Sequence, residues 1–145
     1  MGRWLDPATL TKGTDAALFL LRLYLGCFLI WGVWDNIVSP ARMQEFQAFL
    51  TAVNCPWPAL AAPLSVWVQF LIGLLLVPGL STRWAAILLV VNFLVAVVLI
   101  GRSVGIFPDV ARELFGPMMC VLVGVLLATH GAGAWSIDAR LARRH

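Results

Sequence analysis

The residues of this sequence that could do chemistry are polar side chains set inside or beside long apolar runs. One group combines carboxyl, amide and guanidinium groups with indole rings. From it we expect a cofactor pocket formed by Trp31, Trp34, Asp35, Trp67, Gln69 and Glu113, with Asn36, Arg102 and Arg112 beside them. Polar groups ringed by tryptophan could line a cavity for a flat apolar head such as a quinone. The same groups could instead hydrogen-bond to one another and lock the helices that carry them.

A second group contains Arg22, Arg83 and Asp138. Arg22 follows soon after the start of an apolar run, where a charged side chain is costly unless it pairs or extends to the membrane surface. We therefore expect Asp138 to form an ion pair with Arg22 or Arg83 and to pin the C-terminal segment under the bundle. The alternative is an anionic ligand or a lipid headgroup held by these residues.

Single polar side chains elsewhere suggest little chemistry. Asn92 lies in the middle of an apolar run and is expected to hydrogen-bond between helices. His130 has no second ligand nearby, so we expect it at the membrane surface and predict no metal site. Cys55 could be a reactive thiol that forms a mixed disulfide with another protein, whereas Cys27 and Cys120 are expected to be small buried hydrophobes. No catalytic-triad, nucleotide-binding or CxxC pattern occurs, so a free-standing enzyme is poorly supported.

The elements that must position these residues are predicted to be membrane helices. The chain has 145 residues, of which 61% are hydrophobic and 12% are charged, and a soluble domain carries about twice that charged fraction. Lipid must therefore be the solvent for most of the surface. Apolar runs predict four spanning α-helices at residues 16–38, 60–78, 84–101 and 110–130. We expect them to form one membrane domain over residues 1–145, with the short turn at 78–83 making the middle two antiparallel neighbours.

A short amphipathic helix is expected between the first two spans. Ser39 followed by Pro40 is a helix-start signal. Apolar side chains then recur every three or four residues, at Met43, Phe46, Leu50 and Val53. This pattern predicts a helix that lies on the membrane surface or packs over the bundle.

Lysine and arginine are distributed unevenly between the two ends of the predicted bundle. With the N-terminus inside, the inner segments contain Arg3, Lys12, Arg83, Arg140, Arg143 and Arg144, and the outer segments contain Arg42, Arg102 and Arg112. Because basic residues concentrate on the cytoplasmic side, both termini are predicted to be cytoplasmic and the amphipathic helix extracytoplasmic. The net charge of +3 does not indicate nucleic-acid binding, since the basic residues do not cluster on one polar face.

Parts of the chain resemble the DoxX family of small bacterial membrane proteins. The run LLRLYLGCFLIWGVWDNI, residues 20–37, is similar to the first helix of that family. The run QFLIGLLLVPGLSTRWAA, residues 69–86, follows its pattern of an acidic residue, a glycine, a leucine-rich run, a second glycine and Thr-Arg. The ending GAGAWSID, residues 131–138, is similar to its glycine-rich C-terminal stretch. One departure is Gln69, which stands where the family commonly has Glu and could not act in a proton relay.

The resemblance implies a four-helix bundle in the bacterial inner membrane. Some members of the family resemble or form a subunit of thiosulfate:quinone oxidoreductase, and others are associated with oxidative-stress complexes or with maturation of other proteins. The leading hypothesis is therefore an accessory subunit of a quinone-linked redox system, embedded in the lipid bilayer with a protein partner. A non-enzymatic scaffold and a small-molecule or lipid carrier are the alternatives. Quinone is the one cofactor indicated, no nucleic-acid partner is expected, and homo-oligomerisation stays open.

Overall fold

The computed structural model describes residues 13–103 and 109–144. The described residues form α2 (Thr14–Val38), α3 (Pro40–Ala52), α4 (Pro58–Leu76), α5 (Thr82–Ser103), α6 (Asp109–His130) and α7 (Ile137–Ala142), with no strand among them. Four segments, α2, α4, α5 and the Ala111–His130 part of α6, are long and apolar enough to cross a membrane. The expected all-α fold with four spanning helices is therefore confirmed. Arg3 and Lys12, which enter the charge count, lie outside the described residues.

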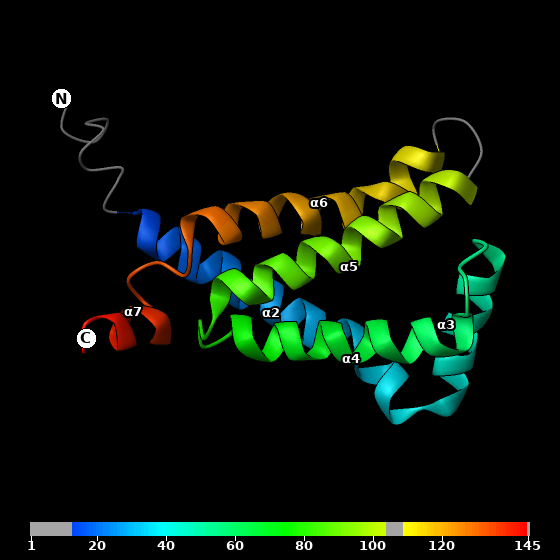
Figure 1. Ribbon diagram of the computed structural model, residues 1–145, viewed down its shortest axis with the longest axis horizontal. Helices are drawn as coiled ribbons and strands as arrows, with labels where there is room; N and C mark the ends of the chain where they lie inside the picture. The colour runs from blue at the N-terminus through cyan, green and yellow to red at the C-terminus, as the bar shows by residue number, and fades with distance from the viewer. Residues whose placement is uncertain (1–12, 104–108, 145) are drawn as a thin grey trace.

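The long helices pack as two close pairs, α2 with α4 and α5 with α6. The first pair meets at two glycines: a Cβ on Gly26 would lie 3.0 Å from the Gly73 carbonyl oxygen, and a Cβ on Gly73 would lie 2.8 Å from that of Gly26. Small residues of this kind let helix backbones approach closely in a membrane. Figure 1 shows that the end of α4 and the start of α5 meet at their shared turn, and that the two helices diverge toward the other end of the bundle. Their packing as neighbours is thus closest near the turn.

Buried apolar side chains concentrate in the half of the bundle that contains the α4–α5 turn. The main cluster consists of Leu18, Leu25, Leu29, Ile72, Leu76, Ala85, Ala86, Leu89, Cys120 and Leu127. A second, small cluster of Leu50, Val53 and Ala62 seats α3 on α4 at the opposite end. The space between α4 and α5 is therefore filled near the turn and bounded by α3 far from it.

Helix α3 is placed across the end of the bundle by the residue that separates it from α2 (Figure 1). Ser39 has an extended backbone, its N–H donates to the Asp35 carbonyl at the end of α2, and its Oγ accepts from the Arg42 N–H at 3.5 Å. Pro40 at the first position of α3 has no N–H to leave unsatisfied. The chain turns back into α4 through Trp57, which has a φ of +52°. The expected helix-start signal at Ser39 and Pro40 is confirmed.

Candidate functional site

A cavity of about 530 Å³ lies between α3, α4 and α5. It occupies the region where α4 and α5 have diverged and α3 stands across them (Figure 1). Its lining residues are Phe46, Phe49, Leu50, Val53, Cys55, Ala61, Leu64, Ser65, Val68, Gln69, Leu88, Val91, Asn92, Phe93, Val95, Ala96, Leu99 and Ile100. The cavity therefore combines side chains from a short crossing helix with those of two spanning helices.

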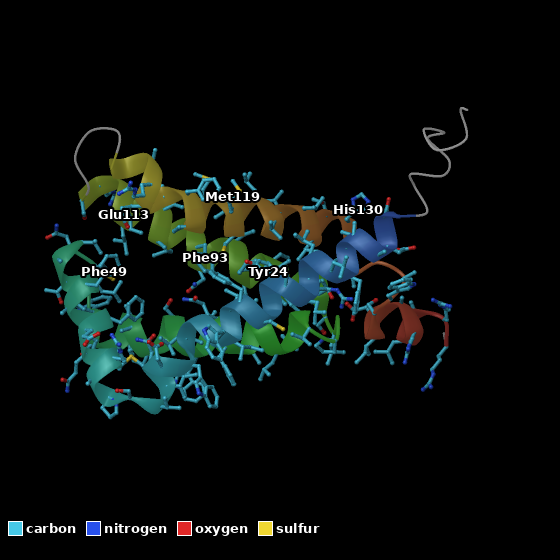
Figure 2. The ribbon with its side chains drawn as sticks, turned by 180° about the vertical axis from the view of Figure 1, so that it is seen from behind. Tyr24, Phe49, Phe93, Glu113, Met119 and His130 are labelled. Carbon is cyan, nitrogen blue, oxygen red and sulfur yellow. The ribbon has the colours of Figure 1, made fainter. Side chains whose placement is uncertain are left out.

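Most of the cavity wall is apolar and part of it is aromatic. The rings of Phe46 and Phe49 on α3 are stacked with their centroids 6.4 Å apart, and Phe93 reaches the cavity from α5 (Figure 2). Leu64 and Val91, which also line the cavity, are 60% and 57% exposed. Because these exposed side chains belong to spanning helices, the cavity opens sideways toward the lipid that must surround them.

Three polar side chains form a hydrogen-bonded chain across this apolar wall. The Gln69 Nε2–H group donates to Ser65 Oγ at 3.0 Å, and the Ser65 hydroxyl donates to Asn92 Oδ1 at 3.0 Å. Ser65 and Gln69 are four residues apart on α4 and therefore share one face of it. Asn92 comes from the middle of α5, so the chain bridges the two diverging helices. Within the described residues, Asn92 Nδ2 and Gln69 Oε1 make no hydrogen bond and remain free to bind a ligand.

The chemistry of this chain is neutral. Among the described residues, no carboxylate, imidazole or guanidinium group lines the cavity, and Cys55 contributes a thiol. Amides and a hydroxyl can recognise a carbonyl or hydroxyl group, but they do not exchange a proton with it near pH 7. The arrangement is therefore suited to binding and orienting a small polar head on an apolar molecule.

Of the cofactor residues expected from the sequence, only Gln69 lines the cavity. Trp31, Trp34 and Trp67 are 82%, 50% and 55% exposed on the outer faces of α2 and α4. Phe70 packs against two of these rings, with centroid distances of 6.4 Å to Trp34 and 6.0 Å to Trp67. The tryptophans thus form part of the outer surface of the α2–α4 pair, because the apolar helices rotate these rings away from the cavity.

The charged members of that expected group are also outside the cavity. Asp35 accepts from the Asn36 N–H at 2.9 Å and lies 3.9 Å from Arg42 Nε at the start of α3. Glu113 is exposed on α6 (Figure 2). Arg42 also pairs with Glu45 at 2.9 Å, and this hydrogen bond is the main cause that raises the pKa of Arg42. All these pairs are exposed, so they contribute little to stability.

The second expected group does meet at one end of the bundle, beside the α4–α5 turn. Arg22 is fully buried and donates to two backbone carbonyls, that of Leu76 at 3.3 Å and that of Trp135 at 2.7 Å. The carboxylate of Asp138 accepts from two backbone N–H groups, Ser81 at 2.7 Å and Thr82 at 2.8 Å. In the part of the chain that the structure describes, no ion pair joins Asp138 to an arginine.

The C-terminal segment is therefore fastened under the bundle through backbone groups, and not through the direct ion pair that the sequence suggests. The physical reason is that backbone groups at the α4–α5 turn are available as partners. The start of α5 leaves free N–H groups, which donate to Asp138. The Leu76 carbonyl accepts from Arg22 in addition to the Gly79 N–H. The backbone N–H groups of Ile137 and Asp138 add bonds to the Pro78 and Gly79 carbonyls at 3.2 and 3.0 Å.

Sequence reasoning missed most of the cavity. It assigned Asn92 to a bond between helices, which the structure shows with Ser65, but it did not single out Ser65 or the phenylalanines of α3 as site residues. The available signal was the pair Ser65 and Gln69, since polar residues four apart on a spanning helix share a face. Among the described residues, no group of three or more His, Cys, Asp or Glu side chains could hold a metal ion.

Comparison with known proteins places the chain in a family. No curated protein and no solved structure matches the chain. The DoxX family model matches residues 17–102, which cover all of α3 and α4 and most of α2 and α5, and so include every residue named above as lining the cavity. The glycine-rich stretch at residues 131–138 lies beyond the matched part. Since the match extends over more than half of the chain, this membrane protein belongs to the DoxX family.

Proposed function

We propose that this protein binds a membrane-soluble molecule of the quinone class in the cavity between α3, α4 and α5. The observation that supports the proposal is the hydrogen-bonded chain of Gln69, Ser65 and Asn92 in an otherwise apolar cavity of about 530 Å³. Binding sites for small molecules are typically apolar cavities of this size with a few convergent polar groups. The apolar tail of such a molecule would extend between Leu64 and Val91 into the lipid.

The polar chain suits a head that changes between carbonyl and hydroxyl forms. In its present direction, the free Asn92 Nδ2–H₂ group can donate to a quinone oxygen and the free Gln69 Oε1 can accept from a quinol hydroxyl. Rotation of both amides would reverse the chain through Ser65 and exchange these two roles. Phe46, Phe49 and Phe93 offer apolar and aromatic surface for the ring.

In this proposal the protein is an accessory subunit of a quinone-linked redox system in the bacterial inner membrane. A neutral site binds the quinone, and a partner protein would carry out the electron and proton exchange. We further propose that residues 1–145 form one membrane domain with both termini in the cytoplasm, as the distribution of Lys and Arg favours. The cavity would then open toward the outer leaflet. A carrier for quinone or lipid would use the same cavity without a redox partner.

The experiment that tests binding is a titration of the purified protein with decyl-ubiquinone in detergent. Asn92→Leu removes a hydrogen-bond partner and is expected to weaken binding about two- to tenfold, the range expected from the loss of one neutral hydrogen bond. Ala96→Phe fills the cavity and should weaken binding further. Trp31→Phe and Glu113→Gln serve as matched controls, because neither residue lines the cavity.

The outcomes of this titration are distinct. Binding that is weakened by the cavity variants alone, with unchanged thermal unfolding midpoints, supports the proposal. Equal affinity in Asn92→Leu, Ala96→Phe and the parent protein rejects this cavity as the site. Weaker binding in Trp31→Phe or Glu113→Gln alone would return the site to the tryptophan-rich group expected from the sequence.

A specific feature of α2 favours a second candidate, a scaffold that anchors a partner protein. Tyr24 lies near the middle of this spanning helix and is 74% exposed, with its ring stacked on Phe28 at 6.5 Å. Its hydroxyl makes no hydrogen bond among the described residues, and an unpaired hydroxyl is costly in hydrocarbon. A membrane helix of a partner could accept this hydrogen bond. A photo-crosslinker at position 24 that gives one defined protein adduct supports this role, whereas lipid adducts alone, as expected at the exposed Leu94, reject it.

A further inference from the structure

A second, smaller cavity lies at the opposite end of the bundle, where α5 begins and α6 ends. Its volume is about 420 Å³, and its lining includes Arg83 and Trp84 of α5, His130 of α6, the loop 131–133 and Asp138 of α7. Figure 1 shows α7 beneath this loop, beside the α4–α5 turn, and Figure 2 shows His130 at the same end. In contrast to the first cavity, this one contains cationic and titratable groups.

Two side-chain donors of this cavity, those of Arg83 and His130, are not used by the described part of the chain. Arg83 lies against the loop, since a Cβ on Gly131 would be 3.4 Å from Arg83 Nε and 3.7 Å from Nη2. The side chains of Arg83 and His130 form no hydrogen bond or ion pair with another described group. The carboxylate of Asp138, in contrast, already accepts two backbone N–H groups. An anion could therefore approach the guanidinium without displacing an internal partner.

The charges around the cavity favour an anion. Arg140, Arg143 and Arg144 follow on or just after α7 and are exposed. The nearby carboxylate of Asp15 is occupied by the Ala134 N–H at 2.8 Å, and buried Arg22 stands close to Gly79 beneath the loop. In the described ranges, the carboxylates of Asp15 and Asp138 at this end are thus outnumbered by arginines.

The level of the cavity relative to the membrane indicates which anion is available to bind there. Trp84 and Trp135 are 71% and 61% exposed at this end of the apolar helices, and tryptophan is enriched at the level of lipid headgroups. Ile137 and Leu141 of α7 are also exposed there. At this level the abundant anion is the phosphate of a phospholipid, and arginine recognises phosphate through paired N–H groups.

We propose that this cavity binds the phosphate group of an anionic phospholipid, with Arg83 and His130 donating hydrogen bonds to its oxygens. This site is separate from the quinone site, because the two cavities share no residue. The same phosphate chemistry could also come from a water-soluble phosphate, and the experiment below separates these two sources. The proposal does not depend on the function proposed above.

The test measures binding of dioleoyl-phosphatidylglycerol to the delipidated full-length protein in detergent, by native mass spectrometry. Arg83→Gln is expected to weaken binding of one lipid about tenfold, the effect of losing hydrogen bonds between charged groups. His130→Gln is expected to weaken it less. Arg102→Gln is the matched control, because Arg102 is an exposed arginine at the other end of the same helix. It should leave binding unchanged.

Each result either supports or overturns the site. Three results together support it. The lipid binds more weakly to Arg83→Gln and His130→Gln alone, phosphatidylcholine binds more weakly than dioleoyl-phosphatidylglycerol, and inorganic phosphate at about a tenfold excess over lipid does not displace the lipid. Displacement of the lipid by inorganic phosphate overturns the assignment to lipid. Equal binding in Arg83→Gln, Arg102→Gln and the parent protein overturns the site itself. Thermal unfolding midpoints of the variants, together with His130→Gln as the milder change, separate lost binding from lost folding.

Discussion

The carboxylate of Asp138 accepts a hydrogen bond from the backbone N–H of Thr82 at 2.8 Å, across 56 residues of sequence. It thereby caps α5 from a different helix, since its second oxygen accepts the N–H of Ser81. A helix start ordinarily takes its cap from the residue directly before it. Here the cap also ties the last helix described, α7, to the turn between two spanning helices.

This relationship predicts the effect of removing the cap. Asp138→Ala should lower the free energy of unfolding by about 1–2 kcal/mol, the usual cost of losing a side-chain cap. Asp138→Asn keeps one acceptor oxygen and should cost less. Unfolding in mixed detergent micelles measures both, with Arg140→Ala on the same helix as the control. A loss in Arg140→Ala equal to that in Asp138→Ala would show that the cap is not the cause.

Arg22 predicts a second stability effect. Arg22→Leu should lower the free energy of unfolding by about 1–3 kcal/mol, because the Trp135 carbonyl loses its donor and the Leu76 carbonyl keeps only the Gly79 N–H. Proteolysis of the C-terminal segment should also become faster, since Trp135 is released. Arg112→Leu, at an exposed arginine of α6, is the control. Unchanged proteolysis in Arg22→Leu would contradict the role given to the Trp135 contact.

Substitution of Gly79 gives a third prediction for stability. A side chain at this position would lack space and would require an unfavourable backbone conformation. Gly79 has a φ of +69°, and a Cβ there would overlap the Arg22 guanidinium. Gly79→Ala should therefore destabilise the protein by more than the roughly 1–2 kcal/mol that the left-handed conformation alone costs. Gly116→Ala is the matched control, since a Cβ there meets nothing within 4 Å. Gly116 is helical, so alanine should be neutral or stabilising by up to about 1 kcal/mol. Equal unfolding midpoints for the two variants would contradict this account.

Cys55 allows the proposed orientation and cavity to be checked together. In a Cys27→Ser, Cys120→Ser background, Cys55 should react with a membrane-impermeant maleimide added to intact spheroplasts, because we place it outside. Decyl-ubiquinone should slow the reaction, because Cys55 lines the first cavity. A cysteine introduced by Arg140→Cys marks the other side and should react only after permeabilisation. The reverse pattern would invert the orientation, and labelling unaffected by decyl-ubiquinone would place the ligand elsewhere.

The fold could be predicted because apolar run length alone determines which segments can span a bilayer. The rotation of each helix could not, because the spanning helices are apolar nearly all round and so carry no polar face to orient them. Trp31, Trp34 and Trp67 illustrate this. Tryptophan in such a group suggests the wall of a cavity, but these three indole rings lie on the outer surface of α2 and α4. Gln69 could be expected beside a cavity because the antiparallel order of the helices puts it in the same half of the bundle as the other polar residues of that group.

The end of the bundle shows a similar limit. The approach of Arg22 and Asp138 to a common region followed from the positions of their segments. Their partners did not, because these are backbone groups at helix ends whose directions depend on the turn at 77–81. Charged residues in a sequence suggest an ion pair, but the sequence does not show that the Leu76 carbonyl can accept from Arg22 or that the Thr82 N–H can donate to Asp138.

The cap at Thr82 also sets an order of events during biosynthesis. Asp138 is added to the growing chain 56 residues after Thr82, a delay of roughly 3–11 s at about 5–20 residues per second. By that time all four spanning helices have been synthesised, but until Asp138 is added the start of α5 lacks the carboxylate that accepts its N–H groups. A chain that stalls or is cut before Asp138 therefore lacks the carboxylate that accepts the Ser81 and Thr82 N–H groups and ties α7 to the α4–α5 turn.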